Sequence, residues 1–314
     1  MSNSFRTILA VPGSNEKMIE KSRTLSVDHL FLDLEDSVTP NSKELARRIV
    51  VNALLQGGFT GNIPLVRIND LESPWWLKDL SKIIQGAGSH INSLIVPKVQ
   101  SAEQVVQIDA EISKLEREIK LPEGKFKIQV QIESASGVMN LKEIAKASGR
   151  LSALVFGPGD FAASIGMQTL HLGDNPVDYA GHDAYHPILM QILVAARANN
   201  LLAIDGPYSD ISNLEGLTRS AQNSAALGFD GKWVIHPSQI ETVNEIFTPR
   251  QSVFDESEAL LELLEGSTSQ GAILFNGKMV DEASRKMAIA IAEKGRAAGM
   301  SRSHNAKRDQ ESKS

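Results

Sequence analysis

The sequence contains no cysteine, which excludes disulfide bonds, thiol nucleophiles and cysteine-based metal sites. The absence also fits a protein that stays in a reducing compartment. Long apolar runs are missing too: the longest are the length of a strand, short of the roughly 18 residues that a membrane-spanning helix needs. The start, Met1–Arg6, is polar and lacks the apolar core of a signal peptide. We therefore expect a cytoplasmic protein with no membrane partner.

The chain also lacks a long block of like charge. Its 314 residues include 32 Lys and Arg against 38 Asp and Glu, for a net charge of -6. We therefore expect no nucleic-acid partner, and an anionic ligand would need a local basic patch. A Gly-x-Ser-x-Gly elbow, a Walker loop and a full Gly-x-Gly-x-x-Gly are absent as well. Hydrolase triads and nucleotide motors therefore find no support in the sequence.

Short apolar runs of four to six residues recur along the chain, each followed by a turn and a longer segment with helical periodicity. This alternation is typical of βα units, and eight units favour a closed barrel over an open doubly wound sheet. We therefore predict the α/β class and a TIM (β/α)8 barrel. The predicted strands are Thr7–Val11, His29–Leu34, Pro64–Asn69, Ser93–Pro97, Lys127–Ile132, Ser152–Phe156, Leu201–Asp205 and Trp233–His236.

The alternation stops in the last part of the chain. Two further helices are predicted there, over about 256–265 and 281–298, joined by a Gly- and Ser-rich segment that begins at Gly266. We predict a barrel domain at 1–249, a C-terminal helical extension at 250–300 that acts as a lid, and a disordered polar tail at 301–314.

Two strand ends near the middle of the chain each carry one carboxylate out of an apolar run. Glu133 follows the run that ends at Ile132, and Asp160 follows Phe156–Gly159. Both side chains would leave the carboxyl edge of the sheet, where α/β enzymes place their chemistry. Oxygen ligands few in number suit Mg²⁺. Either acid alone fits a helix cap equally well, but the glycines beside them indicate close approach of a ligand, and we predict a metal-binding pair.

Further polar side chains close the second and third strands. Arg67 ends the third strand, where its guanidinium could bind a substrate carboxylate or an enolate oxygen; an ion pair with a nearby acid is the equal alternative. Asp33, Glu35 and Asp36 crowd the end of the second strand. They would repel one another without a cation, bound water or arginine nearby. We interpret them as support for Arg67 or for metal-bound water, or as a solvated loop.

The other candidates are weaker. The turn Pro12–Asn15 presents free amides to an anion, with Arg6, Lys17 and Lys21 close in sequence. Asp205, followed by Pro207, is interpreted as pocket wall. His236 is predicted to make a structural hydrogen bond, because no zinc-type spacing of histidines occurs.

Seven motifs together resemble the citrate lyase β-subunit-like (HpcH/HpaI aldolase/citrate lyase) family, over residues 5 to about 300. The motifs are Leu9–Ser14, Leu32–Val38, Val66–Asn69, Val96–Val99, Gln131–Ser134, Val155–Phe161 and Val234–Gln239. Within the family, Ala203–Asp210 and Gly277–Asp281 resemble the malyl-CoA lyase branch, which also includes citramalyl-CoA lyases and malyl-CoA thioesterases.

The resemblance implies a TIM barrel with Mg²⁺, for which Mn²⁺ can substitute, on Glu133 and Asp160, and a substrate-binding role for Arg67. It also implies a homotrimer or homohexamer in which the C-terminal lid covers a neighbouring subunit's site and contributes an acid, here Asp281. Coenzyme A is expected near the first βα turn, at Lys21 first, with Asn15 and Arg6.

The expected activity is a reversible retro-aldol (Claisen-type) cleavage of L-malyl-CoA to glyoxylate and acetyl-CoA. The analogues β-methylmalyl-CoA and citramalyl-CoA, which give propionyl-CoA or pyruvate, are further candidate substrates. A malyl-CoA thioesterase, a citryl-CoA lyase subunit and a non-catalytic subunit that binds CoA esters stay as alternatives. This chemistry needs no Schiff base, so Lys98 is expected to be structural.

Overall fold

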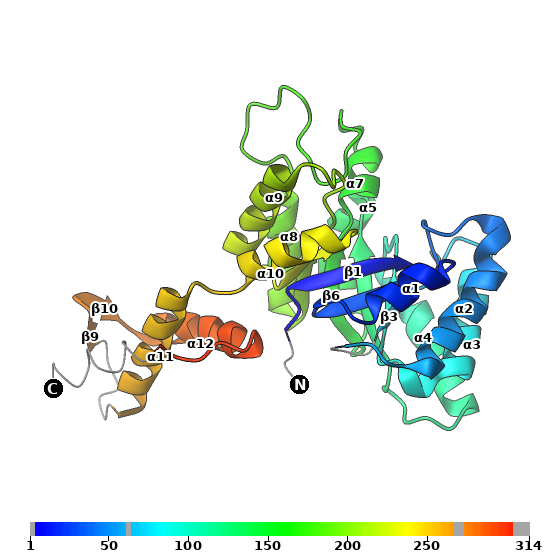
Figure 1. Ribbon diagram of the computed structural model, residues 1–314, viewed down its shortest axis with the longest axis horizontal. Coiled ribbons are helices and arrows are strands. Elements are labelled where there is room, and N and C mark those ends of the chain that lie inside the picture. The colour runs from blue at the N-terminus through cyan, green and yellow to red at the C-terminus, as the bar shows by residue number, and fades with distance from the viewer. Residues whose placement is uncertain (1–3, 61–63, 267–272, 304–314) are drawn as a thin grey trace. The chain divides into compact units, whose positions relative to one another are not determined.

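Eight parallel strands form a closed barrel in the computed structural model, which describes residues 4–60, 64–266 and 273–303. The strands pair in the order β1 to β8, and pairing of β1 with β8 closes the ring, so the predicted TIM barrel is confirmed (Figure 1). The strands are β1 Thr7–Pro12, β2 His29–Asp33, β3 Leu65–Arg67, β4 Ser93–Val96, β5 Lys127–Ile132, β6 Leu151–Phe156, β7 Leu202–Asp205 and β8 Gly231–Val234.

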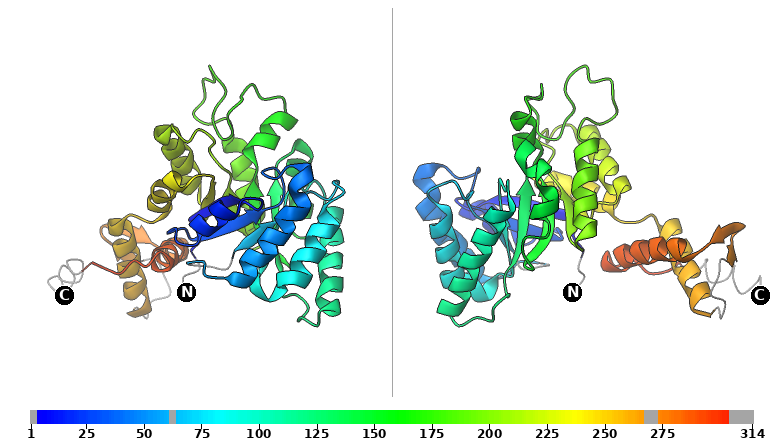
Figure 2. Two further views of the ribbon diagram at one scale, coloured as in Figure 1. Left: turned by 45° about the vertical axis from the view of Figure 1, so that its right-hand side comes forward. Right: turned by 180° about the vertical axis from the view of Figure 1, so that it is seen from behind.

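Helices follow the strands and surround the barrel (Figure 2). The α-helices are α1 Glu16–Ser22, α2 Lys43–Gln56, α3 Trp76–Ala87, α4 Ala102–Glu118, α5 Ala135–Met139, α6 Leu141–Ile144, α7 Pro158–Ser164, α8 His186–Ala198, α9 Leu214–Leu227 and α10 Ile240–Phe247, with 3-10 turns η1 Pro40–Ser42, η2 Gly88–His90 and η3 Pro237–Gln239. None of the helices in the described part of the chain combines the length and the apolar character that crossing a membrane requires.

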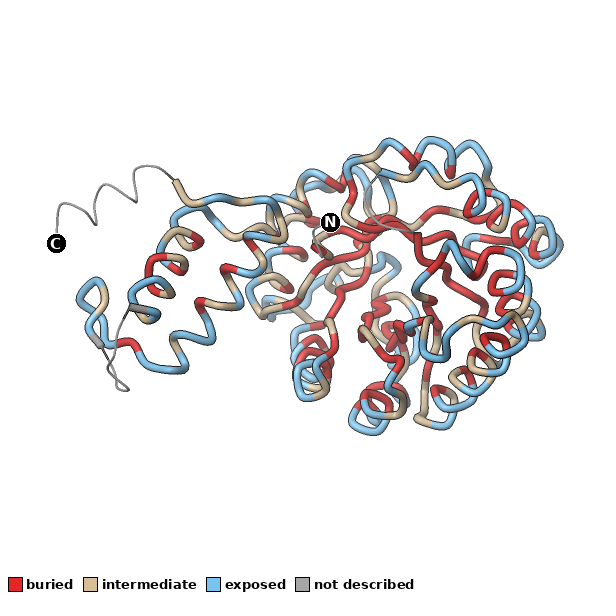
Figure 3. Tube along the Cα trace, turned by 90° about the horizontal axis from the view of Figure 1, so that it is seen from below, coloured by how far each residue is buried: buried red, intermediate tan, exposed pale blue. Residues whose placement is uncertain are grey.

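Strand residues point alternately into the barrel and toward the helices. Those inside form one buried cluster, which includes Ile8, Phe31, Ile204 and Trp233. The alternate strand residues pack against the helices in a second, larger cluster. In Figure 3 the strands are accordingly buried along most of their length, while each helix is buried on one side.

The pairing of neighbouring strands brings the polar candidate residues side by side at the carboxyl edge of the barrel. Asp33 of β2 is the register partner of Arg67 of β3, and Ile132 of β5 is the partner of Phe156 of β6, so the residues that follow them also meet. The predicted eighth strand is wrong by two residues, because His236 already caps η3 and pairing with β1 begins at Lys232.

The chain divides into two compact units, the barrel of Phe5–Phe247 and a unit that contains the residues from Thr248 onward. In the second unit α11 (Gln251–Gly266) and α12 (Glu282–Ala297) confirm the predicted helical extension, and Leu260, Val280 and Ala288 form its core.

A hairpin of β9 (Ile273–Phe275) and β10 (Lys278–Val280) lies between these helices in sequence. It was not predicted, although Asn276 and Gly277, both at positive φ (46° and 73°), form the Asn-Gly turn that signals a hairpin. The polar tail predicted at 301–314 falls, from 304 onward, outside the described residues, as does the segment 267–272.

Candidate active site

Arg67 is the last residue of β3, and its guanidinium is buried at the mouth of the barrel. Two parallel hydrogen bonds join it to Asp33, from Nε to Oδ1 at 2.7 Å and from Nη2 to Oδ2 at 2.8 Å. Its Nη1 lies 3.1 Å from Oε2 of Glu35. The guanidinium carbon lies 5.5 Å from the ring centre of Phe31 and 5.6 Å from that of Trp233. These contacts make Arg67 a fixed positive charge.

The ion pair predicted as one role for Arg67 is therefore present, but it does not occupy the whole guanidinium. With a longer contact from Nη1 to Oε1 of Gln131 at 3.4 Å, these partners use at most four of its five N–H groups. Burial opposes the charge, but Asp33, Glu35 and Glu133 raise the pKa of Arg67 above its ordinary value. At least one N–H of a permanent cation remains for a substrate oxygen.

Glu133 follows β5 and is 4% exposed. Its Oε1 accepts a hydrogen bond from the backbone N–H of Lys98 at 2.7 Å, and its Oε2 accepts one from Nε2 of Gln131 at 2.7 Å. Gly157 lies directly against it, since a Cβ at Gly157 would come within 2.3 Å of Oε2 and 2.4 Å of the Glu133 Cβ. The glycine therefore leaves room for this carboxylate, and both oxygens keep lone pairs for a further ligand.

Neither of the two predicted metal ligands caps a helix. Ser134 is the N-cap of α5 and accepts from the N–H of Gly137, and Gly157 is the N-cap of α7, with Asp160 in its first turn. The capping alternative for both acids is therefore wrong. Burial, and then the negative charge of the exposed Asp160, raise the pKa of Glu133 to about 8. Two carboxylates that repel each other in this way are stabilised in their ionised forms by a cation bound between them.

The two carboxylates fit a hard divalent ion that takes only a few of its ligands from the protein. Among residues 4–60, 64–266 and 273–303, no three His, Cys, Asp or Glu side chains form a group able to hold a metal. A metal at this site would thus have two protein carboxylates and take its other ligands from water and substrate, which is the way Mg²⁺ is commonly held.

Charge balance at the mouth supports the same conclusion. Three cations face five carboxylates, and full ionisation leaves an excess of two negative charges, which one divalent cation would neutralise. The cations are Arg67, Lys98 and Lys43, and the carboxylates are Asp33, Glu35, Asp36, Glu133 and Asp160.

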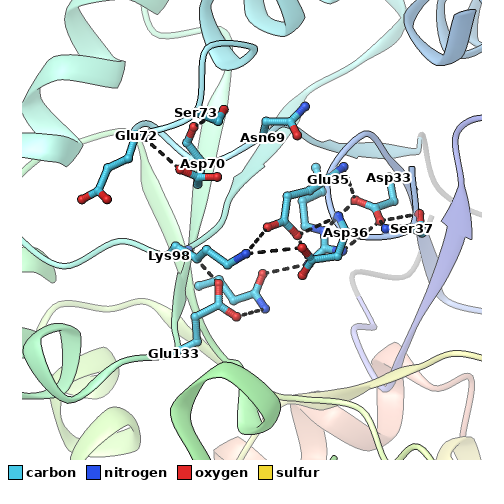
Figure 4. A network of polar contacts seen from close by, with 12 residues as sticks. Asp33, Glu35, Asp36, Ser37, Asn69, Asp70, Glu72, Ser73, Lys98 and Glu133 are labelled. Atoms are coloured by element: carbon cyan, nitrogen blue, oxygen red, sulfur yellow. Dashed lines mark hydrogen bonds and ion pairs between the residues drawn. The ribbon is translucent and has the colours of Figure 1, made fainter. Parts of the chain in front are cut away.

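Glu35 and Lys98 connect the arginine to Glu133, and Asp36 also contacts Lys98. The ammonium of Lys98 lies 2.6 Å from Oε1 of Glu35 and 3.3 Å from Oδ1 of Asp36, as Figure 4 shows. Burial, together with Asp36, raises the pKa of Glu35 to about 7 in spite of Arg67. Of the three interpretations of the acidic loop, the contacts of Asp33 and Glu35 with Arg67 agree with support for the arginine.

Five residues form a closed circuit of contacts that we call the mouth ring. It runs from Arg67 to Glu35, Lys98, Glu133, Gln131 and back to Arg67. Lys98 was predicted only as structural and Gln131 was not singled out. The signal for Gln131 was available, because it stands two residues before Glu133 and so points to the same side of the strand.

Asp205 does not join the mouth ring. Because Ile204 points into the barrel, Asp205 points outward, and its Oδ2 lies 2.5 Å from Nζ of the buried Lys232. The two line a cavity of about 190 Å³ on the helix side of the strands, bordered by α8 and α9. Pro207 follows on the same connection, after Gly206, where a Cβ would collide with Pro158.

The candidates at the first strand are separated by the barrel. Asn15 caps α1 at the mouth side, accepting from the N–H of Met18 at 3.1 Å, and Lys21 is exposed in the last turn of α1. Arg6 precedes β1, at the opposite end, and its guanidinium pairs with Asp28 at 2.7 Å. The structure therefore keeps Arg6 apart from Asn15.

The remaining candidates lie at helix starts. Asp281 is the N-cap of α12 in the second unit, and its exposed carboxylate accepts from the N–H of Ser284 at 3.0 Å. The predicted structural hydrogen bond of His236 is confirmed, because its Nδ1 accepts from the N–H of Ser238 at the start of η3.

Comparison with known proteins gives matches over most of the chain. Residues 6–237 match the family model described as HpcH/HpaI aldolase/citrate lyase. The chain is 37% identical over 293 residues to the L-malyl-CoA/beta-methylmalyl-CoA lyase of Cereibacter sphaeroides (strain ATCC 17025 / ATH 2.4.3), which covers 89% of this chain and 91% of that protein. It is 33% identical over 278 residues to citrate lyase subunit beta of Escherichia coli (strain K12), which covers 88% of each.

A solved structure shares the fold. The protein CitE from Mycobacterium tuberculosis, in complex with magnesium, acetoacetate and coenzyme A, has a TM-score of 0.74 and 26% identity, and the match covers 96% of this chain and 100% of that one. Sequence and structural similarity thus agree with the resemblance carried by the motifs.

Proposed function

Because the chain belongs to the HpcH/HpaI aldolase/citrate lyase family and is a lyase, we propose that it cleaves L-malyl-CoA to glyoxylate and acetyl-CoA in a reversible, Mg²⁺-dependent reaction. β-Methylmalyl-CoA and citramalyl-CoA, which would give propionyl-CoA or pyruvate, are the next candidate substrates. The observation that carries the proposal is the mouth ring, because it holds one fixed cation and one metal-type carboxylate in the same small network.

Different residues bind the two ends of the substrate. Glu133 and Asp160 would hold Mg²⁺, which would supply a Lewis acid at the hydroxy-acid end of the substrate. Arg67 donates an N–H to the thioester oxygen, where negative charge collects as the carbon–carbon bond breaks and the enolate forms. Its contacts with Asp33 and Glu35 are already made, so it needs little rearrangement as that charge develops.

The proton count closes within the reaction. The hydroxyl releases its proton to solvent as it becomes the carbonyl of glyoxylate, and the carbon beside the thioester gains a proton, relayed from solvent, as the enolate becomes acetyl-CoA. We assign the second transfer to Asp281 of a neighbouring subunit, delivered by the C-terminal extension in a homotrimer or homohexamer. Its exposure supports this role, because the carboxylate is open to a partner.

The CoA portion is proposed to lie at the first βα turn. There Asn15 orients the start of α1, and Lys21 stands about 9 Å further along the helix, at 1.5 Å per residue. A flexible ammonium at that distance suits a phosphate of the CoA chain.

An assay panel of the purified full chain tests the proposal. Malyl-CoA, β-methylmalyl-CoA, citramalyl-CoA and citryl-CoA are each incubated with Mg²⁺ or Mn²⁺, and the products are separated by chromatography. Glyoxylate with acetyl-CoA supports the lyase, malate with free CoA identifies a thioesterase, and cleavage of citryl-CoA alone identifies the activity of a citrate lyase subunit. Absence of turnover on all four esters contradicts the proposal.

A second experiment tests the lid. Asp281→Asn keeps a capping side chain for α12, because Asn caps helices as well as Asp, but removes the proton-transferring group. Turnover should fall by about 10²-fold or more, the usual contribution of such a group, while Mn²⁺ binding is retained. Unchanged turnover would remove Asp281 from the mechanism.

A further inference from the structure

We propose that Lys98 is a positioning residue that sets the geometry of Arg67 and Glu133 together. The inference deepens the proposed function and rests on it, since it names the residue that keeps the thioester end and the hydroxy-acid end of the site in register. Figure 4 shows Lys98 between Glu35, Asp36 and Glu133.

Lys98 makes its two contacts with different groups. Its backbone N–H donates to Oε1 of Glu133 at 2.7 Å, and its ammonium lies 2.6 Å from Oε1 of Glu35, whose other oxygen contacts Arg67 at 3.1 Å. The amide fixes the metal-binding carboxylate, and the ammonium fixes the arginine through one intervening carboxylate.

Glu35 cannot easily replace this partner. It is 3% exposed, and its Oε2 already accepts from the N–H of Asp36 at 3.0 Å while facing Arg67. Oε1 depends on the Lys98 ammonium. Without it, a buried carboxylate oxygen loses its charge partner, which is costly enough to rearrange the side chain. Because Glu35 contacts Nη1 of Arg67, a displaced Glu35 removes the partner of that nitrogen, while Asp33 still holds Nε and Nη2.

The backbone at Lys98 adopts a conformation that is unfavourable for a lysine. Its φ is 53°, in the left-handed region that residues other than Gly, Asn and Asp rarely adopt. Gly would suit the same turn without that cost. At Lys98 this conformation accompanies a contact from the amide to Glu133 and one from the ammonium to Glu35.

The position allows the two contacts to be separated by mutation. Lys98→Gly and Lys98→Met both keep the backbone N–H to Glu133 and remove the ammonium, and Lys98→Arg restores the positive charge. Lys120→Gly is the matched control, because Lys120 has nearly the same φ of 58°, is exposed and lies between α4 and β5, at the other end of the barrel.

Turnover and metal binding should then respond differently. For Lys98→Gly and Lys98→Met, kcat on the best substrate of the panel should fall about 10–100-fold, the range for residues that orient ligands from behind. Mn²⁺ affinity, measured by paramagnetic resonance, should change less than about threefold, because the amide remains. Lys98→Arg should recover most of kcat, and Lys120→Gly should match the parent. Equal losses in Lys98→Arg and Lys98→Gly would mean a merely structural role and would overturn the proposal.

A direct readout of Arg67 keeps the proposal testable whatever the substrate is. Trp233 lies 5.6 Å from the guanidinium, and Trp75→Phe with Trp76→Phe leaves it as the single tryptophan of the chain. In this background, Lys98→Gly and Lys98→Met should shift Trp233 fluorescence, and Lys98→Arg should restore it. Unchanged Trp233 emission in both variants overturns the role of Lys98, whereas a parent enzyme without turnover contradicts only the proposed function.

Discussion

Two buried clusters of charged side chains lie at opposite ends of the barrel and are balanced differently. At the amino-terminal end, Arg150 precedes β6 and pairs with Asp109 at 2.5 Å and with Glu116 at 2.6 Å. Its remaining contacts are with the hydroxyl of Ser113 and the carbonyl of Phe126, so all three guanidinium nitrogens have partners. The mouth also has a buried arginine, but five carboxylates face three cations there, an excess of two negative charges, whereas two carboxylates share Arg150.

The pKa values of the buried acids are shifted in opposite directions in the two clusters. Burial opposes ionisation of Glu116 and Asp109, yet their contacts with Arg150, and that of Asp109 with Ser148, hold both pKa values below the usual range. At the mouth, burial raises the pKa of Glu35 to about 7 and that of Glu133 to about 8. In the amino-terminal cluster each acid contacts the arginine directly and ionises readily, whereas at the mouth the contacts do not offset burial and mutual repulsion. This difference separates a structural ion cluster from one suited to binding a cation.

Glu133→Gln should have the largest effect, because it removes one of the two carboxylates proposed to bind the metal. Mn²⁺ affinity should be lost, and kcat should fall by about 10³-fold, since a metal contributes several kcal/mol and each 1.4 kcal/mol is tenfold. The fold should be kept, because the substitution also removes repulsion with Asp160. Glu116→Gln, the same change at the other end, should leave both values intact; Mn²⁺ binding retained in Glu133→Gln would contradict the assignment.

Arg150→Met should produce the reverse pattern. It leaves Asp109 and Glu116 without their cation, and breaking such a buried pair costs about 3–5 kcal/mol of unfolding free energy. Urea denaturation measures the loss, and kcat per folded molecule should stay at the parental value. A loss below about 1 kcal/mol would show that the amino-terminal cluster is not the structural one.

Gly157→Ala should weaken metal binding at the mouth without removing a charged group. The new Cβ would overlap Glu133, and the carboxylate must move away from Gln131 and Lys98. We expect Mn²⁺ affinity to fall about 10–100-fold, as for other changes that misorient a ligand. Gly149→Ala is the control, because a Cβ there meets nothing within 4 Å. Equal affinities in the two variants would contradict the close packing of Gly157 on Glu133.

Periodicity was enough to predict the barrel, because alternating short apolar runs and helical segments leave few other folds. It was not enough for the hairpin β9–β10, whose strands have three residues each and show no alternation long enough to detect. The eighth strand was displaced for a related reason: Lys232 looks polar in sequence but is buried against Asp205.

At the mouth, position at a strand end was the signal that singled out Glu133, Asp160 and Arg67 as candidates, since each follows or ends an apolar run. Asp205, predicted as pocket wall, lines a cavity on the helix side of the strands and not the mouth, because one residue of register turns a side chain from the barrel interior to the helices. The role proposed for Lys98 could not be predicted from the sequence, because it depends on a left-handed backbone and on Glu35, 63 residues away.

The smallest expected effect is the stabilisation of the parent protein by Mg²⁺ itself. If the mouth is short of a cation, binding there stabilises the folded state by mass action, by about 1.4 kcal/mol at ten times the dissociation constant. Thermal unfolding with and without Mg²⁺, at constant ionic strength, measures the shift. Asp160→Asn should abolish it, whereas Asp109→Asn, the same change in the amino-terminal cluster, should lower stability but keep the shift. An equal Mg²⁺ response in both variants would mean that the ion does not distinguish the two clusters, and the difference in their charge balance would then have no bearing on metal binding.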